Sequence, residues 1–202
     1  MIWRVTFGSG RGSGMNFLKP EKGMITLIVG RAGTGKTSLV LQFAREFSIP
    51  FIVDSEGISV KRIEQIGALN ARIARVTSFE QQHATILNFH ERCDFFAVDS
   101  LVMLYRLALA GDPKKANALL AEQMAKLAEM AIRVPVVVTG HIYEKNGKRH
   151  IVSGDVAAYW AKKIVLLEKE GRKRRAILLK HPHEKEKQVV KYEITGNGVR
   201  FL

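Results

Sequence analysis

At 202 residues, with 47% hydrophobic and 25% charged residues, the chain has the length and composition of one domain with a buried core. The single cysteine, Cys93, excludes a disulfide framework, and no apolar run approaches the roughly 18 residues of a membrane span. The N-terminus also lacks the apolar core of a signal peptide. We therefore expect a cytoplasmic protein. The net charge is +13, and residues 141–202 hold 15 Lys and Arg against 7 Asp and Glu. This excess of positive charge indicates a polyanionic partner, with nucleic acid favoured over an acidic protein. The alternative is that the charged residues only solvate the surface.

Glycine and serine fill most of positions 8–14, so we expect residues 1–16 to form a flexible N-terminal segment and residues 17–202 to form one domain. In that domain, short apolar runs alternate with runs of helical character. The predicted strands cover 24–29, 50–54, 72–77, 95–99 and 134–139, and the predicted helices cover 38–47, 60–69, 79–92 and 114–132. Short, wholly apolar strands that alternate with helices indicate an α/β fold, with a mostly parallel sheet and helices on both faces.

The pattern changes after residue 154. A short helix is predicted over 155–161, and strands are predicted over 163–168, 175–180, 189–194 and 199–202, with tight turns between them. Strands joined by such short connections pair antiparallel. We therefore expect antiparallel C-terminal strands that extend the sheet.

A phosphate-binding loop is the clearest motif. Residues 30–37 read Gly-Arg-Ala-Gly-Thr-Gly-Lys-Thr and fit G-x-x-x-x-G-K-[ST] without a mismatch, between a predicted strand and a predicted helix. Backbone N–H groups of such a loop surround the β-phosphate, Lys36 places a positive charge on the β- and γ-phosphates, and the Thr37 hydroxyl can bind Mg²⁺. The residues expected to bind ATP are Gly30, Arg31, Ala32, Gly33, Thr34, Gly35, Lys36, Thr37 and Ser38.

Two acidic residues follow the ends of predicted strands. Asp99 ends one apolar strand, where its carboxylate can hold a Mg²⁺-bound water beside Thr37. Glu56 lies just past the end of another, where it can orient and deprotonate a water that attacks the γ-phosphate. Asp54 lies nearer to the strand and fits a structural role. The alternative is that these acids only cap helices or face solvent.

The order of these motifs resembles the core of the RecA/RadA recombinase family, most of all its short archaeal paralogues of the RadB kind. The similar segments are 52–57, which reads I-V-D-S-E-G against the family's I-D-T-E-G, 98–106 with its strand followed by L-Y-R, 154–162, 174–181 and 192–195. The resemblance runs from about residue 17 to residue 202. It implies a RecA-like P-loop ATPase core that binds ATP and Mg²⁺, uses Glu56 as the catalytic base, and binds DNA in homologous recombination and DNA repair.

Some features depart from the family. The chain has no room for the family's N-terminal DNA-binding domain and no evident F-x-x-A motif for subunit docking, so we expect no long filament, although self-association stays open. Residues 138–141 read V-T-G-H where the family has T-N-Q, whose glutamine senses the γ-phosphate and connects it to a DNA loop. His141 can donate a hydrogen bond in that place, with a charge that depends on pH, or it can merely fill space at the end of the strand.

By the same resemblance, two loops face DNA. The first runs from Arg106 to about Lys115, and the second covers residues 142–150. The residues expected to contact DNA are Arg106, Tyr143, Lys145, Lys148 and Arg149, because cations can follow phosphates while a tyrosine offers a stacking face. The alternative for the second loop is a solvated hairpin, since Asn146-Gly147 is an ordinary tight-turn sequence.

The sequence therefore predicts a DNA-dependent ATPase of weak activity. Single-stranded DNA is the main expected partner, and double-stranded DNA and a recombinase or other repair protein are further candidates. Two other functions stay open: a non-catalytic ATP-binding mediator that acts through a recombinase partner, and a KaiC-like signalling ATPase.

Overall fold

The computed structural model describes residues 16–153, 155–171 and 173–202. Its strands are β1 (Ile25–Gly30), β2 (Pro50–Asp54), β3 (Arg72–Arg75), β4 (Phe95–Asp99), β5 (Val136–Gly140), β6 (Ile142–Lys145), β7 (Lys148–Ile151), β8 (Ala161–Glu170), β9 (Lys173–Lys180), β10 (Val189–Thr195) and β11 (Gly198–Phe201). Its helices are the 3-10 turn η1 (Asn16–Leu18), α1 (Lys36–Ala44), α2 (Val60–Ile66), α3 (Phe79–Leu87), α4 (Met103–Gly111), α5 (Pro113–Ala131) and α6 (Asp155–Trp160).

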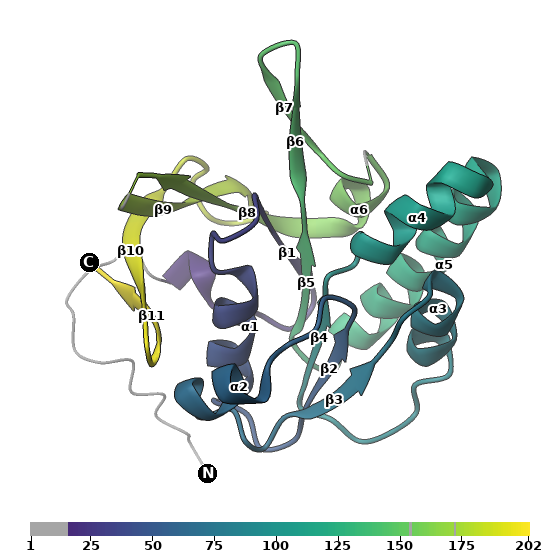
Figure 1. The fold of residues 1–202 in the computed structure, drawn as a ribbon, viewed down its shortest axis with the longest axis horizontal. Coiled ribbons are helices and arrows are strands. Elements are labelled where there is room, and N and C mark those ends of the chain that lie inside the picture. Colours follow the sequence, from purple (N-terminus) through teal and green to yellow (C-terminus); the bar gives the residue numbers. More distant parts are fainter. Residues whose placement is uncertain (1–15, 154, 172) are drawn as a thin grey trace.

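Nine of these strands form one sheet, in the order β11-β10-β9-β8-β1-β5-β4-β2-β3 (Figure 1). The strands from β8 to β3 in this order pair in parallel, and β9, β10 and β11 continue the sheet in antiparallel fashion. This arrangement confirms the predicted fold class. Because the carboxyl ends of parallel strands meet at one edge of a sheet, the segments after β1, β2, β4 and β5 lie together there.

Helices cover both faces of the sheet because successive side chains of a buried strand point to opposite faces. In β1, Leu27 and Val29 pack into the core beneath α3, α4, α5 and α6. Ile28, between them, packs into the second core with α1 and α2. The central strands β1, β2, β4 and β5 are therefore buried along their whole length and mostly apolar, as their composition predicted, whereas the edge strand β3 is only partly buried.

Several helices end before their predicted last residue: α1 ends at Ala44 rather than at residue 47, and α6 ends at Trp160 rather than at residue 161. α2 ends at Ile66 rather than at residue 69, because Gly67 adopts a left-handed conformation (φ 79°) and its N–H closes the last turn. α3 ends at Leu87 rather than at residue 92, where Asn88 leaves the helical conformation. The shorter α3 leaves the chain free to turn back toward β4.

Residues 106–115 do not form the predicted loop. α4 continues to Gly111, and Asp112 caps α5 by accepting a hydrogen bond from the backbone N–H of Lys115 (3.0 Å). Pro113 is the first residue of α5, a position that proline favours. The leucines and alanines of this segment favour a helix over a loop. Arg106 therefore lies on a helix, and the prediction that this segment forms a loop is wrong; its contact with DNA stays a prediction.

The second predicted loop is a hairpin of β6 and β7, which pair antiparallel in a small sheet of their own. Asn146 and Gly147 form its turn with φ angles of 53° and 70°, a conformation that Asn-Gly sequences favour. Figure 1 shows this hairpin standing away from the main sheet. It follows β5 directly, so it starts at the edge where the phosphate loop lies.

Most of the predicted flexible segment 1–16 lies outside the described residues; Asn16 begins η1. The predicted helix after residue 154 is α6, and the predicted cap by the Asp155 side chain lies outside what the structure describes. Among the described residues, none of the helices combines the length and the apolar character that a membrane span needs.

Candidate functional site

The predicted phosphate loop lies between β1 and α1, in the expected order of strand, loop and helix. Gly33 and Gly35 have φ angles of 74° and 97°, in the left-handed region that residues with a Cβ rarely adopt. The Thr34 hydroxyl donates a hydrogen bond to the carbonyl of Arg31 (2.8 Å) and so stabilises the turn of the loop. The loop ends at the N-terminus of the nine-residue α1, whose free N–H groups favour an anion.

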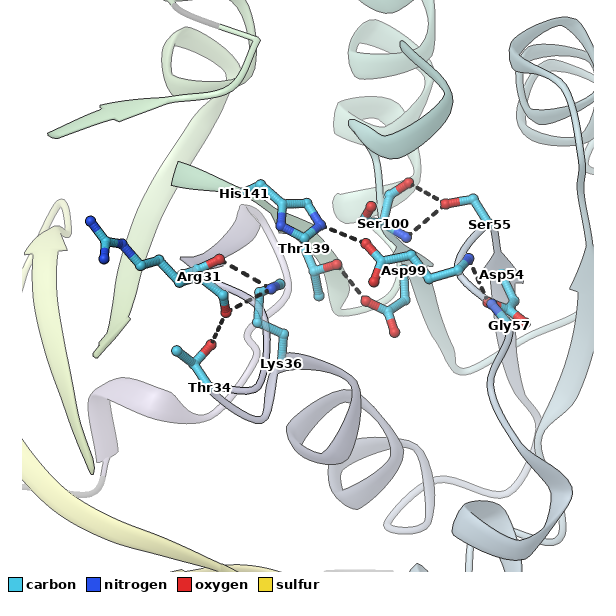
Figure 2. Close-up of polar contacts among 12 residues, drawn as sticks. Arg31, Thr34, Lys36, Asp54, Ser55, Gly57, Asp99, Ser100, Thr139 and His141 are labelled. Carbon is cyan, nitrogen blue, oxygen red and sulfur yellow. Dashed lines mark hydrogen bonds and ion pairs between the residues drawn. The ribbon is translucent and has the colours of Figure 1, made fainter. Parts of the chain in front are cut away.

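Lys36 is buried against the inside of this loop. Its ammonium donates hydrogen bonds to the carbonyls of Gly30 (3.1 Å) and Arg31 (3.3 Å), as Figure 2 shows. Burial lowers the pKa of Lys36, while the charges of Glu56 and Asp99 oppose this effect. The positive charge of Lys36 therefore lies between the loop and the acidic strand ends.

Asp99 ends β4 and is fully buried. The Thr139 hydroxyl donates a hydrogen bond to its Oδ1 (2.5 Å), whereas its Oδ2 has no partner among the described residues. Burial raises the pKa of this carboxyl, and the Thr139 and Thr37 hydroxyls oppose that rise. A buried carboxylate oxygen without a partner, beside a threonine hydroxyl, is the set of hard oxygen atoms that Mg²⁺ prefers. These residues fit the predicted Mg²⁺ site.

Glu56 lies in the loop after β2, and His141 follows the end of β5. The Nε2–H of His141 donates a hydrogen bond to Oε1 of Glu56 over 2.7 Å, and the two side chains are 18% and 26% exposed. This hydrogen bond is the main cause that lowers the pKa of Glu56 to about 2; burial opposes it, and the charge of Lys36 supports it. The predicted base is thus an ionised carboxylate held by the predicted γ-phosphate sensor.

Asp54 shapes the loop that carries Glu56. Its buried carboxylate accepts hydrogen bonds from the backbone N–H groups of Glu56 (3.0 Å), Gly57 (2.8 Å) and Ile58 (2.8 Å). Arg75 on β3 adds an ion pair at 3.3 Å. These contacts match the structural role that the sequence indicated for Asp54.

Ser55 and Ser100 connect the ends of β2 and β4 by hydrogen bonds. The sequence did not reveal this contact. The Ser55 hydroxyl donates to the carbonyl of Ser100 (2.8 Å) and accepts from its N–H (3.0 Å), as Figure 2 shows. Asp54 and Asp99 are direct neighbours in the register of β2 and β4. Ser55 and Ser100, which follow these aspartates, therefore meet each other. The repeated Asp-Ser pair at two strand ends was the available signal.

The antiparallel C-terminal strands are hydrogen-bonded to the phosphate loop and to α1. The sequence did not reveal these contacts. The Tyr192 hydroxyl on β10 donates a buried hydrogen bond to the carbonyl of Thr34 (2.6 Å). Arg62 on α2 binds both the hydroxyl of Ser38 (3.0 Å) and the carbonyl of Thr195 (3.1 Å). Loop, α1 and the last strands are therefore connected by hydrogen bonds.

The predicted DNA-contact residues lie on three elements at the same edge of the sheet: α4, β6 and β7. Arg106 is exposed on α4, and Lys145 and Tyr143 are exposed on β6, where the Tyr143 ring stacks on His150 with 5.4 Å between ring centroids. The backbone of β7 includes the remaining two predicted contacts, whose side chains lie outside what the structure describes: Lys148 and Arg149. Arg31 of the phosphate loop forms an ion pair with Glu144 of the hairpin (2.7 Å).

The nine-stranded sheet with its loop Gly30-Arg-Ala-Gly-Thr-Gly-Lys-Thr37 is that of a RecA-like P-loop protein. No model of a protein family matches the chain. The chain is 33% identical to the DNA repair and recombination protein RadB of Methanosphaera stadtmanae, over 89% of this chain and 88% of that relative. It is 31% identical to the protein of the same name from Methanococcoides burtonii (89% and 90% covered) and 30% identical to that from Methanocaldococcus jannaschii (90% and 95% covered).

The fold agrees with these sequence relationships. A solved structure described as the crystal structure of the RadB recombinase superposes with a TM-score of 0.77, at 22% identity, over 89% of this chain and 91% of that chain. The chain therefore belongs to the RadB family of the RecA/RadA recombinases, as the sequence predicted.

Proposed function

We propose that this chain binds ATP with Mg²⁺ at the phosphate loop, hydrolyses the ATP slowly, and binds DNA in homologous recombination or repair. The observation that carries this proposal is the meeting of Lys36, Asp99 and Glu56 at one edge of the sheet, within reach of one another's charge. The relatives are named DNA repair and recombination proteins, and these names support the proposed role in recombination or repair.

The loop residues supply the binding of the triphosphate. The backbone N–H groups from Gly33 onward face the phosphates, and the ammonium of Lys36 exchanges its carbonyl partners for phosphate oxygens. The residues that would hold Mg²⁺ are Thr37, through its hydroxyl, and Asp99, through its unpartnered Oδ2. When bound, Mg²⁺ neutralises charge that develops on the β- and γ-phosphates.

Glu56 acts on the attacking water. An ionised carboxylate accepts a hydrogen bond from a water and orients it, and His141 fixes the position of that carboxylate. A carboxyl group with a pKa of about 2 accepts a proton only weakly at neutral pH. This low basicity is our reason to expect slow hydrolysis.

The hairpin and α4 supply the contact with DNA. Arg106, Lys145, Lys148 and Arg149 offer positive charge to phosphates, and Tyr143 offers a face on which a base can stack. The ion pair of Arg31 with Glu144 connects the hairpin to the phosphate loop, so ATP and DNA can influence each other's binding through it. Single-stranded DNA is the preferred partner in this proposal.

One observation favours the second candidate, a mediator that binds ATP and a recombinase without turnover. His141 occupies one oxygen of Glu56 at 2.7 Å and holds the pKa of this carboxyl at about 2, which leaves a weak base. If a carboxylate held in this way takes no proton from the attacking water, hydrolysis falls below detection while ATP binding stays intact.

The test is the rate of ATP hydrolysis with and without single-stranded DNA, measured together with the affinity for Mg·ATP. We expect tight binding and a slow rate that DNA increases. Tight binding without any turnover, combined with capture of a purified recombinase, supports the mediator instead. Absence of ATP binding contradicts both.

The DNA part has its own test in the salt dependence of binding. Simultaneous Ala substitution of Lys145, Lys148 and Arg149 should reduce the log–log slope by up to ~2 units, at about 0.7 per phosphate contact on a single strand. A matched control replaces three exposed lysines of the C-terminal part, Lys185, Lys187 and Lys191. Equal slopes in the first variant and the wild type would place the DNA elsewhere.

A further inference from the structure

A cavity of about 1070 Å³ opens beside the phosphate loop, between that loop, α4, α5, the β6–β7 hairpin and the segment that leads into α6. Its size is slightly above the roughly 300–1,000 Å³ typical of small-molecule pockets. Its apolar lining comes from Leu109, Ile142, Ile151, Val152 and Val156, and its polar lining includes Tyr105, Asn117 and Ser153. Arg31, Arg106, His141, Tyr143 and Glu144 also line the cavity. Walls that combine apolar side chains with several polar groups suit a small, flat molecule with apolar faces and polar edges.

Ser153 marks this cavity as more than a gap between elements. Its side chain is buried, and its hydroxyl has no hydrogen-bond partner within the part of the chain that the structure describes. Its φ angle of 87° is in the left-handed region, which serine rarely adopts. A buried, unpartnered hydroxyl is unfavourable unless a ligand or water satisfies it. Ser153 is therefore a candidate hydrogen-bond partner for a molecule in the cavity.

The rim of the cavity carries positive charge and an aromatic ring. Arg106, which is exposed on α4, lines the cavity on one side, and Tyr143, which is 47% exposed, lines it from the hairpin. Lys145 extends the positive charge along the hairpin. Cations at the rim, and walls that offer both apolar side chains and hydrogen-bonding groups, match a nucleotide whose phosphate stays at the rim while its base leaves the stack.

We propose that this cavity receives one unstacked base of a bound single DNA strand, with the neighbouring phosphates along Arg106 and Lys145. The proposal rests on the proposed DNA binding and adds a base pocket to it. An acidic peptide fits less well, because Arg31, one of the two arginines that line the cavity, is already paired with Glu144. Since Arg31 and Ala32 belong both to the cavity and to the phosphate loop, a base in the cavity lies against the ATP site.

The test compares two oligonucleotides of equal length and equal phosphate number, one with bases and one abasic. The wild type should prefer the strand with bases by about tenfold or more. Leu109→Trp fills the cavity and should lower this preference several-fold, with affinity for the abasic strand unchanged. Leu107→Trp is the matched control: it lies on the same helix, is 71% exposed and is not part of the lining, so it should keep the preference.

A second variant covers the case in which Leu109→Trp does not fold. Ser153→Gly removes the hydroxyl and suits the left-handed backbone, so it should fold and should also lower the preference for bases. Retention of the full preference in folded Leu109→Trp, or in Ser153→Gly if the tryptophan variant fails, overturns the base pocket. Equal affinity of the wild type for both strands overturns the pocket alone, whereas binding of neither strand overturns the proposed DNA function and the pocket with it.

Discussion

His141, at the end of β5, donates a hydrogen bond from Nε2 to Oε1 of Glu56 in the loop after β2, over 2.7 Å. The two residues are 85 positions apart in the chain, yet this contact is the main cause of the low pKa of Glu56. It joins the carboxylate that we propose to orient water with the residue that we propose to sense the γ-phosphate. In this proposal the contact connects hydrolysis to the hairpin that follows His141.

The stability of the protein should depend on this contact in a pH window. The pKa of Glu56 falls from its usual 4.5 to about 2 in the folded protein, so its contribution is present above pH 4.5 and is lost as the pH falls toward 2. His141→Ala should therefore be less stable than the wild type above pH 4.5, and the difference should shrink below it. Urea unfolding from pH 7 to pH 3 measures this difference. His90→Ala, an exposed histidine, should show no such trend, and a difference that stays constant for His141→Ala would contradict the pairing.

Glu56→Gln should separate ATP binding from hydrolysis. The amide keeps the size of the side chain but cannot accept a proton or carry the charge. We expect hydrolysis to fall by about 10²-fold or more, because that is the usual contribution of a general base, with Mg·ATP affinity near the wild-type value. Single-turnover rates and nucleotide titrations measure the two quantities.

Asp54→Asn is the matched carboxylate control, because Asp54 lies two residues before Glu56 and its carboxylate binds three backbone N–H groups. Loss of its charge should lower the free energy of unfolding by about 1.5–3 kcal/mol, the range for hydrogen bonds to charged groups. Hydrolysis should fall less than in Glu56→Gln. If the two variants exchange these phenotypes, Asp54 is the base and our assignment is wrong.

Tyr192→Phe should weaken ATP binding, although Tyr192 lies on β10 and not in the phosphate loop. It removes the hydroxyl that donates to the carbonyl of Thr34 (2.6 Å), so we expect a loss of about 0.5–1.5 kcal/mol in the free energy of unfolding. ATP affinity should fall by up to about tenfold, the equivalent of 1.4 kcal/mol. Tyr159→Phe is the control, because Tyr159 is 78% exposed, and it should change neither quantity. Unchanged ATP affinity in Tyr192→Phe would show that β10 does not brace the nucleotide site.

Local patterns in the sequence were enough to predict the α/β fold, the strand–loop–helix context of residues 30–37 and the position of Asp99 at a strand end. Each of these depends on neighbours in the chain, such as the apolar run before Gly30. Contacts between distant residues could not be predicted, because periodicity does not reveal which side chains meet. The hydroxyl of Tyr192, for example, reaches Thr34 across 158 positions.

The error at residues 106–115 has a different cause. The resemblance placed a DNA loop after Arg106, but the leucines and alanines of α4 and the cap by Asp112 favour a continuous pair of helices. Local propensity was the better guide there. The Asn146-Gly147 turn was visible in the sequence, and the backbone of residues 142–151 is a hairpin, as the alternative interpretation of that segment predicted.

The central claim is that ATP binds at the phosphate loop, and the affinity of Lys36→Ala for Mg·ATP tests it most directly. Lys22→Ala, an exposed lysine before β1, is the control. We predict that Lys36→Ala loses affinity by roughly 10- to 150-fold, because hydrogen bonds to charged groups contribute about 1.5–3 kcal/mol, while its far-UV circular dichroism stays unchanged. An affinity equal to that of the wild type and of Lys22→Ala would contradict the account.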